Sequence, residues 1–353
     1  MTLDKKNKIM LFPKIGKFII IFFSIAFLIV AGIGYQLYRY VFEENVKNER
    51  AVIIPENASF DAVIDTLQTH DILENYKAFR WVSKKKKYND AIKPGRYLFK
   101  NGENTNQIVN KLRGGIQEPL ELTFNNIRFK EDLAGKVSRY IQADSVSILN
   151  LFNDTLKIEQ WGFTPETFKA MFIPNTYEFY WTTSATDFAQ RMKQEFERFW
   201  DSRRRKKADE IGFSPVEVSI LASIVQAETA KAEEFERVAG LYINRLKRGI
   251  PLQADPTVKF AVGDFSLRRI LNKHLEIDSP YNTYKHAGLP PGPINFPEIA
   301  SLEAVLNYED HNYMYMSARE DFSGYHNFAV TLSEHNRNAD RYRRALDERK
   351  IWK

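Results

Sequence analysis

The sequence predicts a mixed α+β protein that follows a single N-terminal transmembrane helix. Three observations support this class: an uncharged apolar run, an alternation of strand-like and helix-like segments up to residue 140, and strong helix-start signals from residue 214 onward. Of the 353 residues, 44% are hydrophobic and 14% aromatic, as expected for a folded chain of two or three domains. We divide the chain into an N-terminal segment (1–17), a transmembrane helix (18–40), a small module (51–118), a second α+β and helical region (119–210) and a C-terminal domain (211–353).

The apolar run FIIIFFSIAFLIVAGIGYQL, from Phe18 to Leu37, is long enough to cross a bilayer once as a helix. Before it lie five lysines against one aspartate, whereas the charges after it are balanced. This lysine excess predicts a cytoplasmic N-terminus and export of everything after Tyr40. A cleaved signal peptide is the alternative, but GIGYQLYRYVF offers no convincing small-residue cleavage site. We therefore expect a retained anchor.

The charge of the chain argues against a nucleic-acid partner. The net charge is +6, of which the N-terminal segment supplies +4 (five lysines minus one aspartate), so the exported part is nearly neutral. Two basic runs, Lys84–Lys87 and Arg203–Lys207, are interpreted as solvated loop or helix faces. The chain has no cysteine, so disulfides and a thiolate nucleophile are excluded.

The module at 51–118 is predicted to be a small α+β unit. A β-branched strand begins at Ala51, and Ser59 is a suitable N-cap for a helix with apolar residues at helical spacing. A turn and a short strand follow at Lys93–Phe99, and a second helix at Asn104–Gly115 is closed by glycines. Two strands and two helices are therefore expected here.

The region at 119–210 repeats part of this pattern. Leu120–Tyr140 again suggests a strand, a turn and a helix, and residues 141–210 are expected to be mainly helical. The segment FIPNTYEFYW, Phe172–Trp181, interrupts the helices with aromatic residues around a Pro-Asn turn, which favours core packing.

The C-terminal domain begins with three agreeing helix-start signals, namely Ser214 as N-cap, Pro215 at the first helical position and Glu217 of a capping box. A second helical pattern ends at Gly249. Residues 251–297 are rich in Pro, Gly, Asn and Tyr and are expected to form a long, ordered, site-building loop. The tail is expected to fold as helix, strand, strand and helix.

Glu228 is the candidate catalytic residue. In a helix it falls on the apolar stripe of Leu221, Ile224 and Val225, near the helix C-terminus. Burial and the negative helix end both disfavour its charged form and raise its pKa, as a general acid near neutral pH requires. The alternative is a structural ion pair with Arg237 or Arg245.

Other polar residues are weaker candidates. Asp255 in QADPT is a possible second carboxylate or a turn residue before Pro256. Tyr281, Asn282 and Tyr284 carry donors suited to sugar hydroxyls and acetamides, although loop packing explains them equally well. The six histidines show no metal-ligand spacing, so no metal site is expected.

Four ordered blocks now define a resemblance that covers nearly the whole chain: ILASIVQAETA, VAGLYINRLKRGIPLQADPTV, SPYNTYKHAGLPPGPI and YHNFAVTLSEHN. The chain resembles the MltG/YceG-like endolytic murein transglycosylases. The resemblance implies a membrane enzyme, facing outward from the cell inner (cytoplasmic) membrane, that cuts nascent peptidoglycan strands between N-acetylmuramic acid and N-acetylglucosamine. It implies a LysM-like module at 51–118, a catalytic domain at 211–353 and no cofactor.

By this resemblance Glu228 is the catalytic glutamate. We expect Gln253, Asp255, Tyr281 and Asn282 to position the substrate. Cell-wall synthases or division proteins are conceivable partners. The chain departs from its relatives where they carry EKET, having Gln226 and Ala227 before Glu-Thr, and where they carry FPDTY, having Asn175. The segment FNN at residues 124–126 replaces a usual strand-Pro-Glu turn.

The expected reaction leaves a 1,6-anhydro end, with Glu228 as both acid and base and the substrate acetamide stabilising the cation. Two alternatives stay open. One is a lysozyme-like hydrolase in which Asp255 activates water. The other is an anchored peptidoglycan-binding scaffold whose glutamate is structural.

Overall fold

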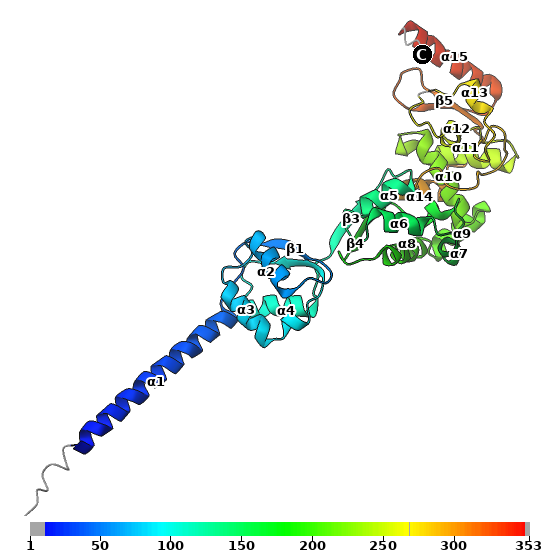
Figure 1. Ribbon diagram of the computed structural model, residues 1–353. Helices are drawn as coiled ribbons and strands as arrows, with labels where there is room; N and C mark the ends of the chain where they lie inside the picture. Colours follow the sequence, from blue (N-terminus) through cyan, green and yellow to red (C-terminus); the bar gives the residue numbers. More distant parts are fainter. Residues whose placement is uncertain (1–10, 268, 350–353) are drawn as a thin grey trace, which may run out of the picture. The chain divides into compact units, whose positions relative to one another are not determined.

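A computed structural model describes residues 11–267 and 269–349 and confirms a mixed α+β protein with one N-terminal apolar helix (Figure 1). The chain forms two compact units, one comprising Met1–Leu120 with Tyr180–Thr182 and the other Glu121–Phe179 with Thr183–Lys353. The boundaries expected at residues 118 and 210 stay predictions.

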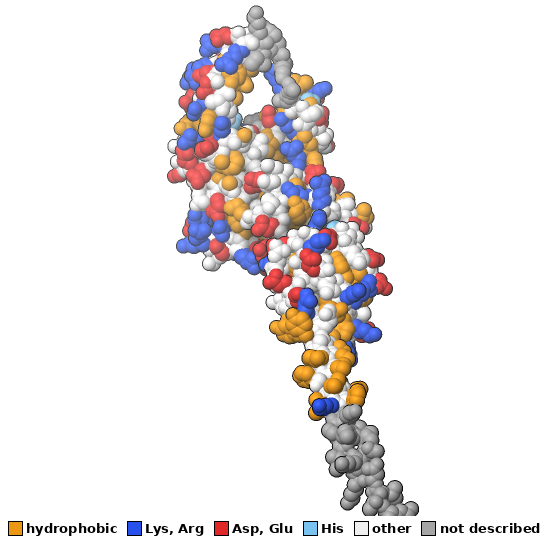
Figure 2. Space-filling model, turned by 90° about the vertical axis from the view of Figure 1, so that its left-hand side faces the viewer, with side chains coloured by type: hydrophobic (Ala, Val, Ile, Leu, Met, Phe, Trp, Pro, Cys, Tyr) orange, Lys and Arg blue, Asp and Glu red, His pale blue; other side chains and the backbone are white. Residues whose placement is uncertain are grey.

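Helix α1 (Leu11–Phe42) contains the apolar run and is the N-terminal helix of the first unit. The stretch Lys17–Phe42 contains an 18-residue window with a mean hydropathy of 2.6, and its 26 residues are enough to cross a membrane as a helix. The phenylalanines and isoleucines of Lys17–Phe42 are exposed, and Figure 2 shows hydrophobic side chains gathered along this part of the helix. So large an apolar surface is unfavourable in water, which fits a membrane anchor.

The rest of the first unit packs helices around a two-stranded sheet. Strands β1 (Arg50–Ile54) and β2 (Gly95–Phe99) pair antiparallel, and helices α2 (Phe60–Thr69) and α4 (Thr105–Gly114) complete the predicted elements. The Ser59 hydroxyl accepts the Ala62 N–H, as expected of an N-cap. The buried apolar residues of both strands and the helices form one core.

This unit has one α-helix more than predicted, α3 (Tyr76–Lys85), followed by a 3₁₀ turn at Tyr88–Asp90. The prediction of two helices was wrong because the basic run masked the helix end. Lys84 and Lys85 lie in the last turn, where positive charge is favourable against the helix dipole. The basic run is therefore a solvated helix terminus, and Lys86 donates to Asn110.

The second unit begins at the second residue of strand β3 (Leu120–Phe124), which pairs with β4 (Asn175–Phe179). Between and after these strands lie five α-helices and a 3₁₀ turn: α5 (Lys130–Val137), α6 (Ser145–Phe152), α7 (Thr155–Gln160), η2 (Phe168–Met171), α8 (Ala185–Phe199) and α9 (Ser202–Ile211). The strand, turn and helix predicted at 120–140 are confirmed. Asn126 adopts a positive φ of 50° in the turn, a conformation that asparagine tolerates.

Helix α10 (Pro215–Glu228) lies at the centre of this unit. The predicted start is confirmed, since Ser214 and Glu217 form a capping box with Pro215 between them. Every residue from Val218 to Val225 is buried, so the helix is covered on all sides and not along one stripe only. Neighbouring helices supply this cover, among them α9, α11 (Phe235–Lys247), α12 (Asp255–Val262) and α14 (Ile299–Leu306).

Helix α11 approaches the chain after α14 closely at Gly240. A Cβ atom there would lie 2.3 Å from the Glu309 carbonyl oxygen, so only glycine allows this approach. The remaining tail is as predicted: hairpin strands β5 (Tyr315–Ala318) and β6 (His326–Ala329), then helix α15 (Leu332–Glu348).

The segment 251–297 contains more helix than predicted, with α12 and the short α13 (Asn272–Leu275) inside it. Asp255 was considered as a turn residue before Pro256, but both residues lie in the first turn of α12, where the missing N–H of Pro256 costs nothing.

Candidate active site

Glu228 is the last residue of α10, at the point where this buried helix reaches a cavity. Thr229 follows in an extended conformation with φ −138° and ends the helix. Glu228 is half-buried, and burial raises its pKa to about 7, with a smaller rise from the negative charge of Asp255. The Tyr242 hydrogen bond and the positive charge of Lys259 act in the opposite direction.

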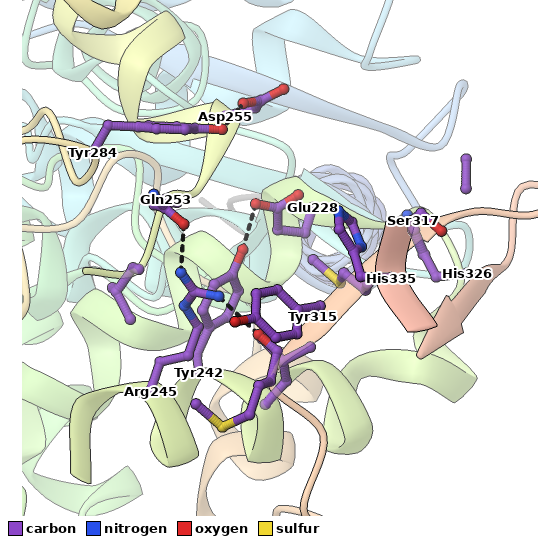
Figure 3. A pocket seen from close by; sticks show the side chains of 15 residues that line it. Glu228, Tyr242, Arg245, Gln253, Asp255, Tyr284, Tyr315, Ser317, His326 and His335 are labelled. Carbon is purple, nitrogen blue, oxygen red and sulfur yellow. Dashed lines mark hydrogen bonds between the residues drawn. The ribbon is translucent and has the colours of Figure 1, made fainter. Parts of the chain in front are cut away.

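Tyr242 on α11 is the direct partner of this carboxyl group. Its hydroxyl donates to Glu228 Oε1 at 2.5 Å, and Figure 3 shows the two side chains pointing toward each other. Tyr242 is itself buried, which raises the pKa of its phenol and keeps the hydroxyl a donor. The bond holds the carboxyl in one orientation.

The alternative of a structural ion pair is not supported. Arg237 pairs with Glu309 at 2.9 Å, and Arg245 donates to the carbonyl oxygens of Pro251 and Met314. Within residues 11–267 and 269–349, no arginine or lysine forms an ion pair with Glu228.

Arg245 instead orders one wall of the cavity. It is only 5% exposed, and its guanidinium also donates to Gln253 Oε1 at 2.6 Å (Figure 3). Gln253 has a positive φ of 52°, which is unfavourable for a side-chain-bearing residue and is compensated by these contacts. The predicted site residue Gln253 therefore lines the cavity in a position set by Arg245.

Asp255 lines the same cavity, whose volume is about 410 Å³. Its Oδ1 accepts a hydrogen bond of 2.6 Å from the Tyr284 hydroxyl. Burial raises the pKa of Tyr284 far above its usual value, so this hydroxyl stays protonated. The cavity thus holds one carboxyl group that tends to be protonated near neutral pH and a second one that accepts a phenol hydrogen bond.

Tyr281 and Asn282 do not line this cavity. The Asn282 side chain is fully buried and donates to the carbonyl oxygens of Leu275 and Ile277. The Tyr281 ring packs on Phe260 with centroids 4.7 Å apart. Both residues organise the loop in this structure, and their direct part in substrate positioning stays a prediction.

Sequence reasoning missed the part of the wall formed by the C-terminal hairpin and helix. Ser317, His326 and His335 line the cavity and appear in Figure 3. Ser317 Oγ and His335 Nδ1 are buried and have no hydrogen-bond partner among the described residues. Only the histidines of the block YHNFAVTLSEHN could have pointed to this wall.

A buried carboxylate connects this wall to the end of α10. Glu234 is 3% exposed and accepts hydrogen bonds from the backbone N–H of His326 and from the Thr229 hydroxyl. Its Oε2 also lies 2.8 Å from His326 Nδ1. Because Thr229 follows Glu228 directly, this cluster ties the catalytic candidate to strand β6.

Gln226, two residues before Glu228, accepts hydrogen bonds from a neighbouring element. Its Oε1 accepts the backbone N–H of Glu298 at 2.7 Å and the Ser301 hydroxyl at 3.0 Å. It therefore joins α10 to the start of α14 just before the site.

The geometry defines a class of site: an acid–base centre with one half-buried glutamate, held by a tyrosine, in a polar cavity. The model of the YceG-like family matches residues 52–341, and the chain belongs to this family. Relatives named endolytic murein transglycosylase include a Bacillus subtilis (strain 168) protein that is 28% identical over an alignment of 324 positions. The alignment covers 87% of this chain and 88% of the relative.

A Streptococcus pneumoniae (D39) protein of the same name is 25% identical over 361 residues, covering 91% of this chain but 64% of the relative's length. The crystal structure of a putative yceG-like protein from Listeria monocytogenes superposes with a TM-score of 0.54 at 27% identity. It covers 82% of this chain and 99% of its own.

Proposed function

We propose that this protein is an endolytic murein transglycosylase, which cuts the bond between N-acetylmuramic acid and N-acetylglucosamine inside peptidoglycan strands. The observation that carries the proposal is Glu228, with a pKa raised to about 7 and a hydrogen bond to Tyr242, in the wall of the cavity. Membership of the YceG-like family and the names of the relatives support it.

In the proposed reaction, protonated Glu228 donates its proton to the glycosidic oxygen as the bond to C1 of muramic acid breaks. The carboxylate that results then takes the proton of the C6 hydroxyl, whose oxygen forms a new bond to C1. Protons balance, no water is consumed, and a 1,6-anhydro end is left. A pKa near 7 suits both steps, because the group is readily protonated and readily deprotonated at neutral pH.

The substrate is held by the polar groups of the cavity. Gln253 and Asp255 are placed to meet sugar hydroxyl and acetamide groups, with Ser317 and His335 as free polar groups on the opposite strand and helix. Tyr242 keeps the Glu228 carboxyl oriented toward the bond that breaks.

Helix α1 is proposed to be a retained single-pass anchor in the cell inner (cytoplasmic) membrane, with the N-terminus inside and the rest outside. Its length and hydropathy support this, together with the lysine excess before it. Residues 51–118 are proposed to be a LysM-like module, and residues 211–353 to be the catalytic domain. Such an enzyme would end the growth of new strands.

The test incubates the full chain in detergent with peptidoglycan strands and identifies the new ends by mass spectrometry. Anhydro ends are lighter than hydrolysed ends by one water molecule, so the two products are distinguished directly. Wild type is expected to leave anhydro ends and Glu228→Gln none. Glu210→Gln, an exposed change on α9, is the matched control and should retain activity.

The lysozyme-like alternative is favoured by one observation, the presence of Asp255 in the same cavity as Glu228. It predicts reducing ends, lost in both Glu228→Gln and Asp255→Asn. Intact cleavage by Glu228→Gln would remove the glutamate from the mechanism, and absence of cleavage by wild type would favour the scaffold.

A further inference from the structure

Glu228 borders a second hollow besides the cavity described above. This hollow has a volume of about 330 Å³ and includes Arg128, Lys259, Phe265 and Asn295 in its lining. Because Glu228 belongs to the wall of both, a strand whose scissile bond lies at this carboxyl can extend parts into each. The proposed reaction itself uses only the first cavity.

Two cationic side chains in this hollow lack carboxylate partners. The Arg128 guanidinium lies over the Phe265 ring, 4.0 Å from its centroid, which holds the planar group by stacking. In the described part of the chain, neither Arg128 nor Lys259 forms an ion pair, whereas Arg204, Arg237 and Arg341 in the same unit do. The hollow therefore offers positive charge to a ligand.

Asn295 supplies a hydrogen-bond acceptor to the same hollow. It is 7% exposed, and its Nδ2 donates to the Ser223 carbonyl oxygen at 2.8 Å. This contact fixes the orientation of the amide, since the reverse orientation would set two oxygens against each other. Its Oδ1 is buried without a partner in the described structure, and so it can accept an N–H from a ligand.

The acidic groups nearby do not cancel this charge. Glu228 has a raised pKa and is partly protonated near neutral pH. Asp132 lines an adjoining hollow that shares Arg128 and Asn295, yet it makes no ion pair with Arg128. Lys169, in another adjoining hollow that Glu131 also lines, lies 4.5 Å from the Phe260 ring centroid. Burial lowers its pKa to about 8, so this lysine is still mostly charged near neutral pH.

We propose that this hollow binds the peptide stem of the murein strand, with a stem amide N–H donating to Asn295 Oδ1 and a stem carboxylate lying against Arg128 and Lys259. The inference rests on the proposed function. An N–H donor next to a carboxylate is the chemistry of a peptide attached to muramic acid, whereas a phosphate polymer has no N–H to give. The enzyme accordingly prefers strands that carry stems.

The experiment compares two substrates, uncrosslinked glycan strands with their peptide stems and the same strands stripped of stems by an amidase. Full-length protein in detergent is used as wild type, Arg128→Gln, Arg128→Lys and Arg203→Gln. Arg128 and Arg203 are both exposed, so the changes leave the fold intact, and Arg203 on α9 is the matched control. The readout is kcat/KM for each strand type.

For wild type, we expect kcat/KM on stem-bearing strands to be about tenfold higher than on stripped strands, which corresponds to roughly one charge-assisted hydrogen bond. Arg128→Gln should lose most of this preference while its rate on stripped strands stays unchanged. Arg128→Lys should retain part of the preference and Arg203→Gln all of it.

Equal wild-type rates on both strands would overturn the stem site and leave the proposed function standing. An equal loss on both strands in Arg128→Gln would likewise overturn it, because a stem contact cannot slow stripped strands. No wild-type cleavage of either strand would instead overturn the proposed function.

Discussion

The Tyr242 hydroxyl is expected to set the pH range in which the protein works. The change Tyr242→Phe removes this hydroxyl and keeps the aromatic ring. The hydroxyl donates to Glu228 at 2.5 Å and thereby stabilises the charged carboxylate, which lowers the pKa of Glu228 against the larger effect of burial. The change therefore raises this pKa above its value of about 7.

The size of the shift follows from the strength of the bond. A hydrogen bond to a charged group contributes about 1.5–3 kcal/mol, and one pKa unit corresponds to about 1.4 kcal/mol. Glu228 is only half-buried, so water replaces part of the lost contact. We expect a rise of roughly one unit, at the lower end of this range.

The assay measures kcat/KM for strand cleavage by the full chain between about pH 5 and pH 9. The fall of kcat/KM on the alkaline side of this pH profile, its alkaline limb, reports loss of the catalytic proton. The limb should have its midpoint near 7 in wild type, the pKa of Glu228, and shift upward in Tyr242→Phe. Tyr308→Phe, which removes an exposed hydroxyl that accepts a hydrogen bond from Lys247, should leave it in place. An unmoved limb, or a shift to lower pH, would refute the reasoning.

Three further predictions concern stability and mechanism. Glu228→Gln should have a higher melting temperature than wild type at pH 8 but not at pH 4, which thermal melts at the two pH values check. The pKa of Glu228 in the folded protein, about 7, exceeds the ordinary 4.5, so wild type loses stability as the pH rises between these values. The loss is at most about 3 kcal/mol. Gly240→Ala should destabilise the protein by about 1–3 kcal/mol in urea unfolding, because its Cβ would meet the Glu309 carbonyl oxygen at 2.3 Å; an unchanged midpoint would contradict the close approach. Arg245→Lys should raise KM several-fold, since an ammonium cannot reproduce the planar guanidinium fork that bonds Gln253 and the carbonyl oxygens of Pro251 and Met314 together. A KM equal to that of wild type would show that Gln253 does not need this support.

Much of the local structure follows from short-range patterns. The capping box at Ser214 and Glu217 and the N-cap at Ser59 mark helix starts by contacts three residues apart, which a sequence displays directly. The apolar run in α1 needs no tertiary partner to be recognised. Helix α3 was not predicted because its last turn is a lysine run, and α12 was not predicted because the composition of residues 251–297 was interpreted as that of a loop.

The sequence by itself determined that Glu228 ends an apolar helix and that Gln253 and Asp255 follow in one block, because spacing along the chain carries this information. Only the tertiary structure decided which groups surround that carboxyl. Tyr242 donates a hydrogen bond to it from the next helix, and His335 of the last helix, more than one hundred residues away, lines the same cavity. It also removed Asn282 from the cavity wall by burying its amide among loop carbonyls. The physical reason is that a pKa and a binding wall depend on burial and on partners distant in the chain, and neither is written in local spacing.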